Sequence, residues 1–221
     1  MVFCLIVKKG MDIQNIRKEY KLLELNEADI DRHPLKQFAF WFGDALKSDN
    51  HYPNAMVLST VSPDCRPSSR IVLLKGFSEK GFEFFTNYQS KKADHLEQHK
   101  YASLLFFWPQ LERQVRIEGH AEKLTINESE EYFKQRPLES QLSAWASPQS
   151  SIIGNRGDLI TLYQKHELMF AGTSPKRPTH WGGYRLVPDL FEFWQGREHR
   201  LHDRIEYFKD NEGWKFRRLA P

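Results

Sequence analysis

The sequence has few cysteines and no long hydrophobic run. Its 221 residues include two cysteines, Cys4 and Cys65, and neither lies in a CxxC motif or a Cys/His metal-ligand spacing. This argues against a disulfide scaffold and favours a reducing, cytoplasmic location. The apolar run over residues 2–7 is too short to span a bilayer. Because lysines follow that run and no small-residue cleavage site appears, it does not resemble a signal peptide either.

The chain also lacks a strong charge of one sign. It has 32 Lys and Arg against 29 Asp and Glu, a net charge of +3. A charge this small and scattered argues against nucleic-acid binding, so any preference for anions must come from local clusters. There is no internal repeat, no low-complexity segment and no GxGxxG, which disfavours a doubly wound nucleotide-binding fold.

The patterns that are present predict a mainly β protein with flanking helices. We expect an extension over residues 1–11, with Met11 as the working start, and a single domain over 12–221. Short β-rich runs separated by turn signals favour an antiparallel barrel with helices outside. Strands are expected over these stretches: 55–62, 68–77, 82–87, 101–108, 112–124 with a bend at Gly119, 184–196, 204–210 and 214–221. Helices are expected over 12–25, 33–49, 90–100, 127–136, 139–147 and 157–170, the fourth opened by Asn127 as N-cap with Glu130 three residues on.

The stretch "FEFWQGREHRLHDR" concentrates positive charge after a Gln-Gly turn. If the part after the turn is extended, then Arg200, His202 and Arg204 share one face, beside Trp194, which is expected to be buried. A planar guanidinium such as Arg200 can stack on an aromatic ring, which a lysine does poorly.

Two further stretches contain basic residues that could bind phosphate. Arg70 and Lys75 bracket an apolar run and lie on opposite faces of a regular strand; both could equally be strand-end residues exposed to water. Lys91 and Lys92 fall in the first turn of a helix opened by Ser90. A cation is unfavourable there unless it shares an anion with the free N–H groups. A basic helical turn that is simply exposed to water explains Lys91 and Lys92 equally well.

A third stretch carries polar groups around a proline. Tyr132, Arg136 and Ser140 recur at helical spacing, and Pro137 is expected to break the helix and aim Arg136 and Ser140 at one spot. Together they suit a phosphate, although a solvated helix face explains them as well. Gln114, mid-strand, needs a hydrogen-bond partner if it is buried, such as a flavin edge or, more commonly, a neighbouring backbone group. The sequence thus predicts two separate phosphate sites, Arg70/Lys91/Lys92 and Lys75/Tyr132/Arg136/Ser140, with the Arg200/His202/Arg204 face between them.

These residues lie in stretches that resemble the pyridoxine (pyridoxamine) 5′-phosphate oxidase family. The resemblance runs from about residue 16 to 221 and is carried by "RIVLLK", "LERQVRIEG", "YFKQRPLESQLSAWAS", "WGGYR", "FWQGREHRLHDR" and the terminal "RLAP". It implies an FMN-binding split barrel that works as a homodimer with FMN at the subunit interface. The implied reaction oxidises pyridoxine or pyridoxamine 5′-phosphate to pyridoxal 5′-phosphate with O₂. H₂O₂ is released, as is ammonia when the substrate is the amine.

The resemblance also implies roles for individual residues. FMN contacts would fall on Arg70, Ile71, Val72, Leu73, Leu74, Lys75, Phe85, Thr86, Lys91, Lys92, Gln114, Gln149, Ser150, Trp194 and Arg204. Substrate contacts would fall on Arg17, Lys18, Glu19, Tyr20, Lys75, Tyr132, Arg136, Ser140, Arg200, Leu201 and His202, with Arg200 and His202 beside the reacting ring.

Three positions depart from the family pattern. Phe85 stands where Tyr is expected, Lys91 where Arg is usual, and Lys18 where another Arg is expected. Two alternatives remain open: a split-barrel flavoenzyme acting on another aromatic, such as a phenazine-type oxidase, and a non-catalytic FMN- or haem-binding protein. The full Tyr132/Arg136/Ser140 set favours a phosphorylated substrate over both.

Overall fold

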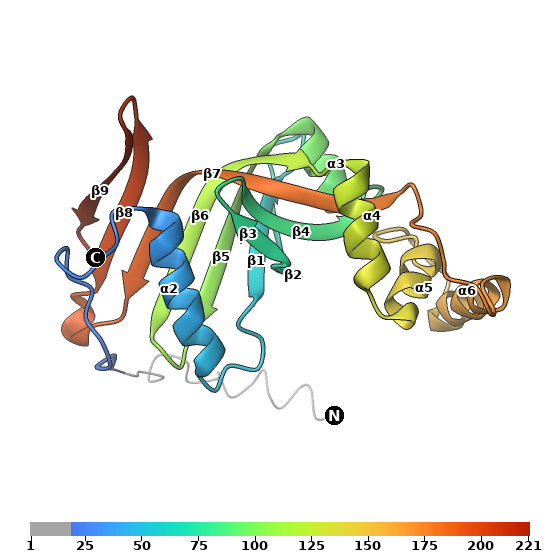
Figure 1. Cartoon of the computed structure of the whole chain (residues 1–221), viewed down its shortest axis with the longest axis horizontal. Helices are drawn as coiled ribbons and strands as arrows, with labels where there is room; N and C mark the ends of the chain where they lie inside the picture. The colour runs from blue at the N-terminus through green and yellow to red at the C-terminus, as the bar shows by residue number, and fades with distance from the viewer. Residues whose placement is uncertain (1–18) are drawn as a thin grey trace, which may run out of the picture.

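A computed structural model describes residues 19–221 of the chain (Figure 1). The expectations for residues 1–11, Arg17 and Lys18 therefore lie outside the described residues. The strands are β1 (Ala55–Val61), β2 (Pro67–Leu73), β3 (Gly76–Ser78), β4 (Gly81–Asn87), β5 (Tyr101–Trp108), β6 (Arg113–Lys123), β7 (Trp181–Gln195), β8 (Asp203–Asp210) and β9 (Gly213–Leu219). The helices are α2 (Pro34–Lys47), α3 (Lys91–Gln98), α4 (Ile126–Gln135), α5 (Leu138–Ala146) and α6 (Arg156–Met169), with a short 3₁₀ turn η1 (Glu198–Arg200).

The strands form one antiparallel sheet that curls on itself. Its path runs β2-β1-β5-β6-β7-β4-β3, and β8 and β9 extend it from β7. Because β2, at one edge, also contacts β4 near the other edge, the sheet closes partway into a barrel. The helices lie outside the sheet, with α4, α5 and α6 together at one end (Figure 1). The predicted fold class, an antiparallel split barrel with flanking helices, is confirmed.

The core is rich in aromatic side chains. Phe38 of α2 is fully buried, and its ring packs against Phe77, Phe82 and Phe106 with centroids 4.9–5.1 Å apart. Burying one such side chain is worth about 1.5–3 kcal/mol. In β6 the register shifts at Gly119, where a Cβ atom would lie 2.0 Å from the Val187 carbonyl oxygen, so the predicted bend needs glycine. This core fixes the barrel and the positions of the strand ends.

Most predicted elements are confirmed, and three differ. The strand expected over 68–77 is interrupted at residues 74–75, which separate β2 from β3. Residues 19–25, within the expected first helix, are not helical, because Glu112, in the turn before β6, and Asp203, at the start of β8, accept hydrogen bonds from their backbone. Helix α4 begins two residues earlier than expected: Thr125 is the N-cap and forms the capping box with Glu128, in place of Asn127 and Glu130. Among residues 19–221, no helix is both long and apolar enough to cross a membrane.

Candidate active site

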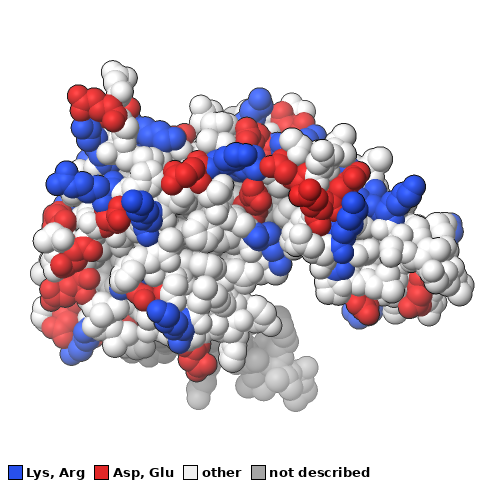
Figure 2. Space-filling view, viewed as in Figure 1, with Lys and Arg blue, Asp and Glu red and all other residues white. Residues whose placement is uncertain are grey.

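A cavity of about 1000 Å³ lies between the sheet and the helices at its end. It is lined by β2, β4, the start of α3, the α4–α5 junction and the loop after α5. Figure 2 shows acidic and basic side chains interspersed over the visible face, which is hollowed between the sheet and the α4–α6 lobe. The cavity lining differs from that surface, because it includes no Asp or Glu. It does include five cations: Arg70, Lys75, Lys91, Lys92 and Arg136.

Arg70 is held by the edge of the barrel. Its Nη1 donates to the Leu58 carbonyl (3.0 Å) and the Thr60 hydroxyl (2.8 Å), and its Nη2 donates to the Ser68 hydroxyl (2.7 Å). A guanidinium has five N–H groups, so two are left without a partner among residues 19–221. Both remaining groups can bind a ligand anion in the cavity that Arg70 lines.

Lys92 sits in the first turn of α3, beside the free N–H groups of the helix. Its Nζ donates to Thr86 (3.1 Å), Ser90 (3.2 Å) and Gln149 (2.8 Å), none of which is charged. Burial, together with Arg70, lowers the pKa of Lys92 to about 8. An ammonium without a carboxylate partner at a helix N-terminus is well placed to bind phosphate.

The opposite wall of the cavity is aromatic. Phe85 stacks on Tyr132 (centroids 3.9 Å apart) and on Trp181 (5.4 Å), and the Arg136 guanidinium lies 4.5 Å from the centre of the Trp181 ring. Pro137 separates α4 from α5, as predicted, so Arg136 caps the end of α4 and lies near Ser140. Among residues 19–221, the buried Nη1 of Arg136 has no hydrogen-bond partner, which leaves it available to a ligand.

The structure unites the two predicted phosphate sites in this single cavity. Lys75 follows the end of β2, so the expected opposite-face argument does not apply and both Arg70 and Lys75 line the cavity. The predicted residues that it brings together are Arg70, Ile71, Val72, Leu73, Lys75, Phe85, Thr86, Lys91, Lys92, Tyr132, Arg136, Ser140, Gln149 and Ser150. Leu74 is instead part of the hydrophobic core.

A second group of predicted residues lies at the far end of β7. Trp181 lines the cavity, and Trp194 is thirteen residues further along the same strand. At about 3.3 Å per residue, the two are about 40 Å apart along the strand. Gln114 pairs with Trp194 across β6 and β7, and neither residue lines the cavity.

Trp194, His202 and Tyr20 form a half-buried aromatic cluster. The Trp194 and His202 rings lie 4.7 Å apart, and Tyr20 packs edge-on against both at 5.5 and 5.8 Å. His202 Nδ1 accepts the backbone N–H of Arg197 (3.1 Å), so its other nitrogen, Nε2, bears the proton of the neutral ring. Burial and Arg200 lower the pKa of His202, which favours that neutral form.

The expectation of an extended chain with three cations on one face is wrong. Residues Glu198–Arg200 form a 3₁₀ turn, and His199 and Arg200 both have positive φ, 57° and 62°. Two consecutive non-glycine residues in this region indicate strain, which is often stored at functional sites. Arg200 is exposed, and its side chain has no ion pair or hydrogen bond to residues 19–221. Leu201, beside it, is also exposed.

The Arg204 side chain is bound by other groups of the same protomer. It forms a bidentate ion pair with the buried Glu192 (3.0 and 3.0 Å) and donates to the Ala220 carbonyl (2.7 Å). Glu192 also binds Arg116 at 2.6 Å. The sequence pattern missed Glu192 because its partners lie on neighbouring strands.

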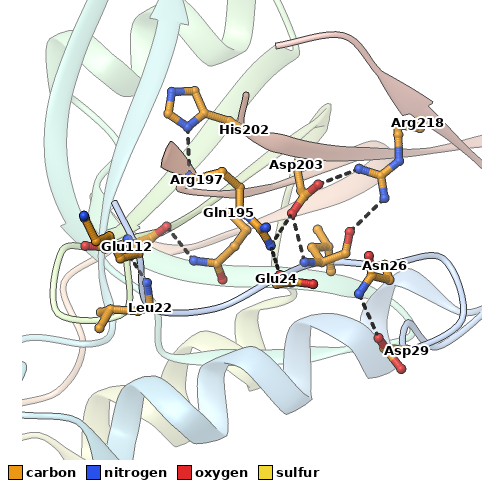
Figure 3. Close-up of polar contacts among 12 residues, drawn as sticks. Leu22, Glu24, Asn26, Asp29, Glu112, Gln195, Arg197, His202, Asp203 and Arg218 are labelled. Carbon is orange, nitrogen blue, oxygen red and sulfur yellow. Dashed lines mark hydrogen bonds and ion pairs between the residues drawn. The ribbon is translucent and has the colours of Figure 1, made fainter. Parts of the chain in front are cut away.

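The segment that carries Tyr20 is held by buried carboxylates (Figure 3). Glu112 accepts the backbone N–H groups of Lys21 (2.8 Å) and Leu22 (3.1 Å), and Asp203 accepts that of Leu25 (3.1 Å). Gly196 lies directly beneath Tyr20, and a Cβ atom there would be 2.6 Å from the ring. Glu19 is exposed and pairs with Lys21. These contacts fix Tyr20 over Trp194 and His202.

Sequence reasoning missed several cavity residues, although some carried a signal. Trp181 belongs to the "WGGYR" stretch, for which the resemblance implies no ligand contact. Ser68 and Ser69 immediately precede Arg70 in the sequence. Asn87, Gln135, Ser143 and Ser147 also line the cavity and lie next to predicted residues. In residues 19–221, no cluster of His, Cys, Asp or Glu is arranged to hold a metal ion.

Family models match most of the chain. The model described as "Pyridoxamine 5′-phosphate oxidase" matches residues 42–159, and "Pyridoxine 5′-phosphate oxidase C-terminal dimerisation region" matches 181–221. A pyridoxine/pyridoxamine 5′-phosphate oxidase of Janthinobacterium sp. (strain Marseille) is 52% identical, over 96% of this chain and 100% of the relative. The one from Pseudomonas fluorescens (strain Pf0-1) is 49% identical, over 95% and 98%.

Solved structures share the fold. PhzG from Burkholderia lata 383, in complex with tetrahydrophenazine-1-carboxylic acid, gives a TM-score of 0.86 at 28% identity, over 92% of this chain and 100% of that one. A pyridoxamine 5′-phosphate oxidase-related, FMN-binding protein from Nostoc punctiforme PCC 73102 gives 0.68 at 19% identity, over 86% and 98%. The second likeness concerns the fold alone.

Proposed function

Because this chain belongs to the pyridoxine/pyridoxamine 5′-phosphate oxidase family, we propose that it oxidises pyridoxine or pyridoxamine 5′-phosphate to pyridoxal 5′-phosphate, with FMN as cofactor and O₂ as electron acceptor. The carrying observation is the cavity lined by five cations and no carboxylate. Such a cavity favours dianionic phosphate groups over neutral or cationic ligands. The proposed location is the cytoplasm, where the exposed free Cys65 stays reduced.

The residues present fit FMN and a phosphorylated substrate. We assign the FMN phosphate to Arg70, Lys91 and Lys92, supported by the two unused N–H groups of Arg70 and by Lys92 at the start of α3. The substrate phosphate is assigned to Lys75, Tyr132, Arg136 and Ser140, supported by the unpartnered Arg136 Nη1. Phe85 lacks the hydroxyl of the family's Tyr but keeps the ring that stacks on Tyr132.

We propose that a second copy of the chain completes the site. Arg200, His202 and Trp194 lie at or beyond the opposite end of β7 from Trp181, and none of them lines the cavity. Residues 181–221, which carry Arg200 and His202, match a family region described as a dimerisation region. The homodimer would place these residues and Gln114 against FMN held by the partner, and Arg204 would lie nearby with its guanidinium bound to Glu192.

Mixed dimers test this arrangement. Arg136→Ala and Arg200→Ala each disable a different half of the site, so at substrate concentrations far below KM both homodimers should have at most about a tenth of wild-type activity. A heterodimer of the two contains one site with both wild-type residues, so the refolded mixture should recover about a quarter of wild-type activity. If the mixture stays as inactive as its parents, then Arg136 and Arg200 act within one protomer or not at all.

The chain's own residues would bind, orient and exclude water. When bound, FMN would supply the acceptor for the two electrons removed at C4′ of the substrate, and O₂ would be reduced to H₂O₂. With pyridoxamine 5′-phosphate, water would hydrolyse the resulting imine to pyridoxal 5′-phosphate and ammonia. Arg200 would hold the substrate ring against the flavin, and His202 Nε2–H would donate to a polar ring substituent. Tyr20, on the segment bound by Glu112, would cover the ring and exclude water.

A phenazine-type oxidase is the second candidate, because PhzG shares the fold at 28% identity. The molecule bound to PhzG, tetrahydrophenazine-1-carboxylic acid, is a tricyclic carboxylate without phosphate. Tyr132, Arg136, Ser140 and Lys75 together favour phosphate over such a ligand. Turnover of reduced phenazine carboxylates with none of B6 phosphates would select this alternative.

The proposal is tested with purified protein in air. The protein should carry a yellow flavin spectrum, and its extracted flavin should be FMN. Added pyridoxamine 5′-phosphate should give pyridoxal 5′-phosphate absorbance with one H₂O₂ per turnover. A colourless protein that takes up no FMN and leaves B6 phosphates unchanged would refute the proposal.

A further inference from the structure

Two buried residues lie behind Arg70 without lining the cavity. Thr60 of β1 is 1% exposed and His95 of α3 is 2% exposed. The Thr60 hydroxyl lies 2.8 Å from Arg70 Nη1 and 3.0 Å from His95 Nδ1. A chain of hydrogen bonds therefore links the cavity cation to the inner face of α3.

The chemistry of the three groups sets the direction of this chain. Arg70 can only donate, so the Thr60 oxygen accepts from it. The Thr60 hydrogen then needs an acceptor, and His95 Nδ1 is the one within reach among residues 19–221. Donation to Nδ1 satisfies every group only when His95 is neutral with its proton on Nε2.

The charges around His95 keep it in that neutral form. Burial is the largest effect that lowers the pKa of His95. Arg70 and Lys91 lower it further, while Asp94 and Asp64 raise it. A protonated His95 would have to donate from Nδ1 to Thr60, which would leave the Thr60 hydrogen without an acceptor. The histidine therefore acts as a fixed acceptor at the end of the chain.

The consequence falls on the N–H groups that Arg70 has left for a ligand. Leu58, Thr60 and Ser68 take three of its five N–H groups, which fixes the plane of the guanidinium. Without the Thr60 acceptor, Nη1 keeps only the Leu58 carbonyl, and the plane can rotate. Bidentate binding of phosphate depends on that plane.

We infer that Thr60 and His95 are positioning residues that orient Arg70 for the phosphate of the flavin cofactor. The inference rests on the proposed function in that the ligand tested is FMN. A merely structural role, in which the pair only fastens α3 to β1, would weaken binding of any flavin equally.

The experiment compares FMN with riboflavin, which lacks the phosphate. Apo-protein is titrated with each flavin, and the dissociation constant is read from quenching of flavin fluorescence. Thr60→Val removes the hydroxyl and keeps the branched shape, whereas Thr60→Ser keeps the hydroxyl. His95→Leu removes the acceptor, whereas His95→Asn keeps an oxygen near the position of Nδ1. The ³¹P resonance of bound FMN gives a second readout.

Thr60→Val and His95→Leu should each weaken FMN binding about tenfold or more. Riboflavin binding should change by less than about twofold, and Thr60→Ser and His95→Asn should remain close to wild type. The ³¹P resonance of bound FMN should shift in the Val and Leu variants only. If one of these two variants fails to fold, the other still decides, because each breaks the chain of hydrogen bonds at a different residue.

Three outcomes would overturn the inference. Unchanged FMN binding in Thr60→Val would mean that the hydroxyl does not orient Arg70. Equal weakening for both flavins would assign the pair a structural role alone. A wild-type protein that binds neither flavin would refute the proposed function and the inference with it, and the wild type alone distinguishes that case.

Discussion

The cavity and the β8–β9 end of the molecule are both rich in cationic side chains, but they differ in whether those side chains have acidic partners. No acidic residue lines the cavity. At the β8–β9 end, Arg204 is bound to Glu192 and Arg218 is bound to Glu27. Arg218 is also bound to Asp203 (Figure 3). Similar side chains are therefore left without acidic neighbours in the cavity lining and are neutralised by ion pairs at the β8–β9 end.

This difference shows which cationic side chains of the fold are not already neutralised by an acidic partner. Ion pairs at the β8–β9 end neutralise their own cations, so they need no ligand. Cavity cations such as Lys92 are desolvated without a carboxylate, and the lowered pKa of Lys92 reports that unfavourable state. Arg200 is the exception at the paired end, since it is exposed and has no partner among residues 19–221.

The largest expected effect comes from breaking a pair at the β8–β9 end. Glu192 is 3% exposed and binds both Arg204 and Arg116, so Glu192→Gln should lower the free energy of unfolding by about 3 kcal/mol. Urea unfolding measures this. Glu212→Gln, which loses only an exposed pair with Lys215, should change it by about 0.5 kcal/mol or less. Equal effects would mean that burial does not distinguish the two pairs.

The next largest effect is expected for Arg200, the exposed cation that has no partner among residues 19–221. Arg200→Ala should lower kcat about 100-fold, because the substrate ring loses its clamp, while FMN stays bound. Arg200→Lys should recover little, since a lysine cannot stack as a planar guanidinium does. Steady-state kinetics with the flavin content measured in parallel decide this. Near-normal turnover would remove Arg200 from the site.

A smaller effect is expected for a cavity cation that faces the substrate. Arg136→Ala should raise KM for pyridoxamine 5′-phosphate about tenfold or more, because charge-assisted hydrogen bonds to the phosphate are lost. The KM for unphosphorylated pyridoxamine should change little, which serves as the internal control. An unchanged KM for the phosphorylated substrate would place its phosphate elsewhere.

The smallest effect is a pH dependence of FMN binding. Lys92 in the free cavity is protonated below its pKa of about 8 and loses its charge above it. Bound phosphate favours the protonated form, so binding takes up a proton and weakens as pH rises. The dissociation constant should increase about tenfold between pH 7 and 9, where the phosphate itself is fully ionised. Lys92→Arg keeps its charge and should flatten the profile, whereas a steep profile in that variant would exclude Lys92 as the cause.

The sequence predicted the barrel and most of the cavity because both depend on local patterns. Alternating runs marked the strands, and Pro137 marked the break that puts Arg136 near Ser140. The family motifs also contain many of the residues that line the cavity. This includes Arg70 and Lys75, for which spacing alone predicts opposite faces of a strand.

What could not be predicted depends on partners distant in sequence. Residues 19–25 are polar and weakly periodic, and their non-helical conformation is held by the carboxylates of Glu112 and Asp203, which are distant in sequence. The pairing of Arg204 with Glu192 depends on strand register. For α4, both Thr125 and Asn127 have a glutamate three residues on. Glu128 also binds Arg185, a tertiary contact that supports the Thr125 cap.

The contrast between the two regions is tested most directly by how much the phosphate group of the substrate increases kcat/KM. The account predicts that kcat/KM for pyridoxine 5′-phosphate exceeds that for pyridoxine at least about 1000-fold, since the unpaired cavity cations bind only the former strongly. A ratio near one in FMN-loaded protein would contradict it.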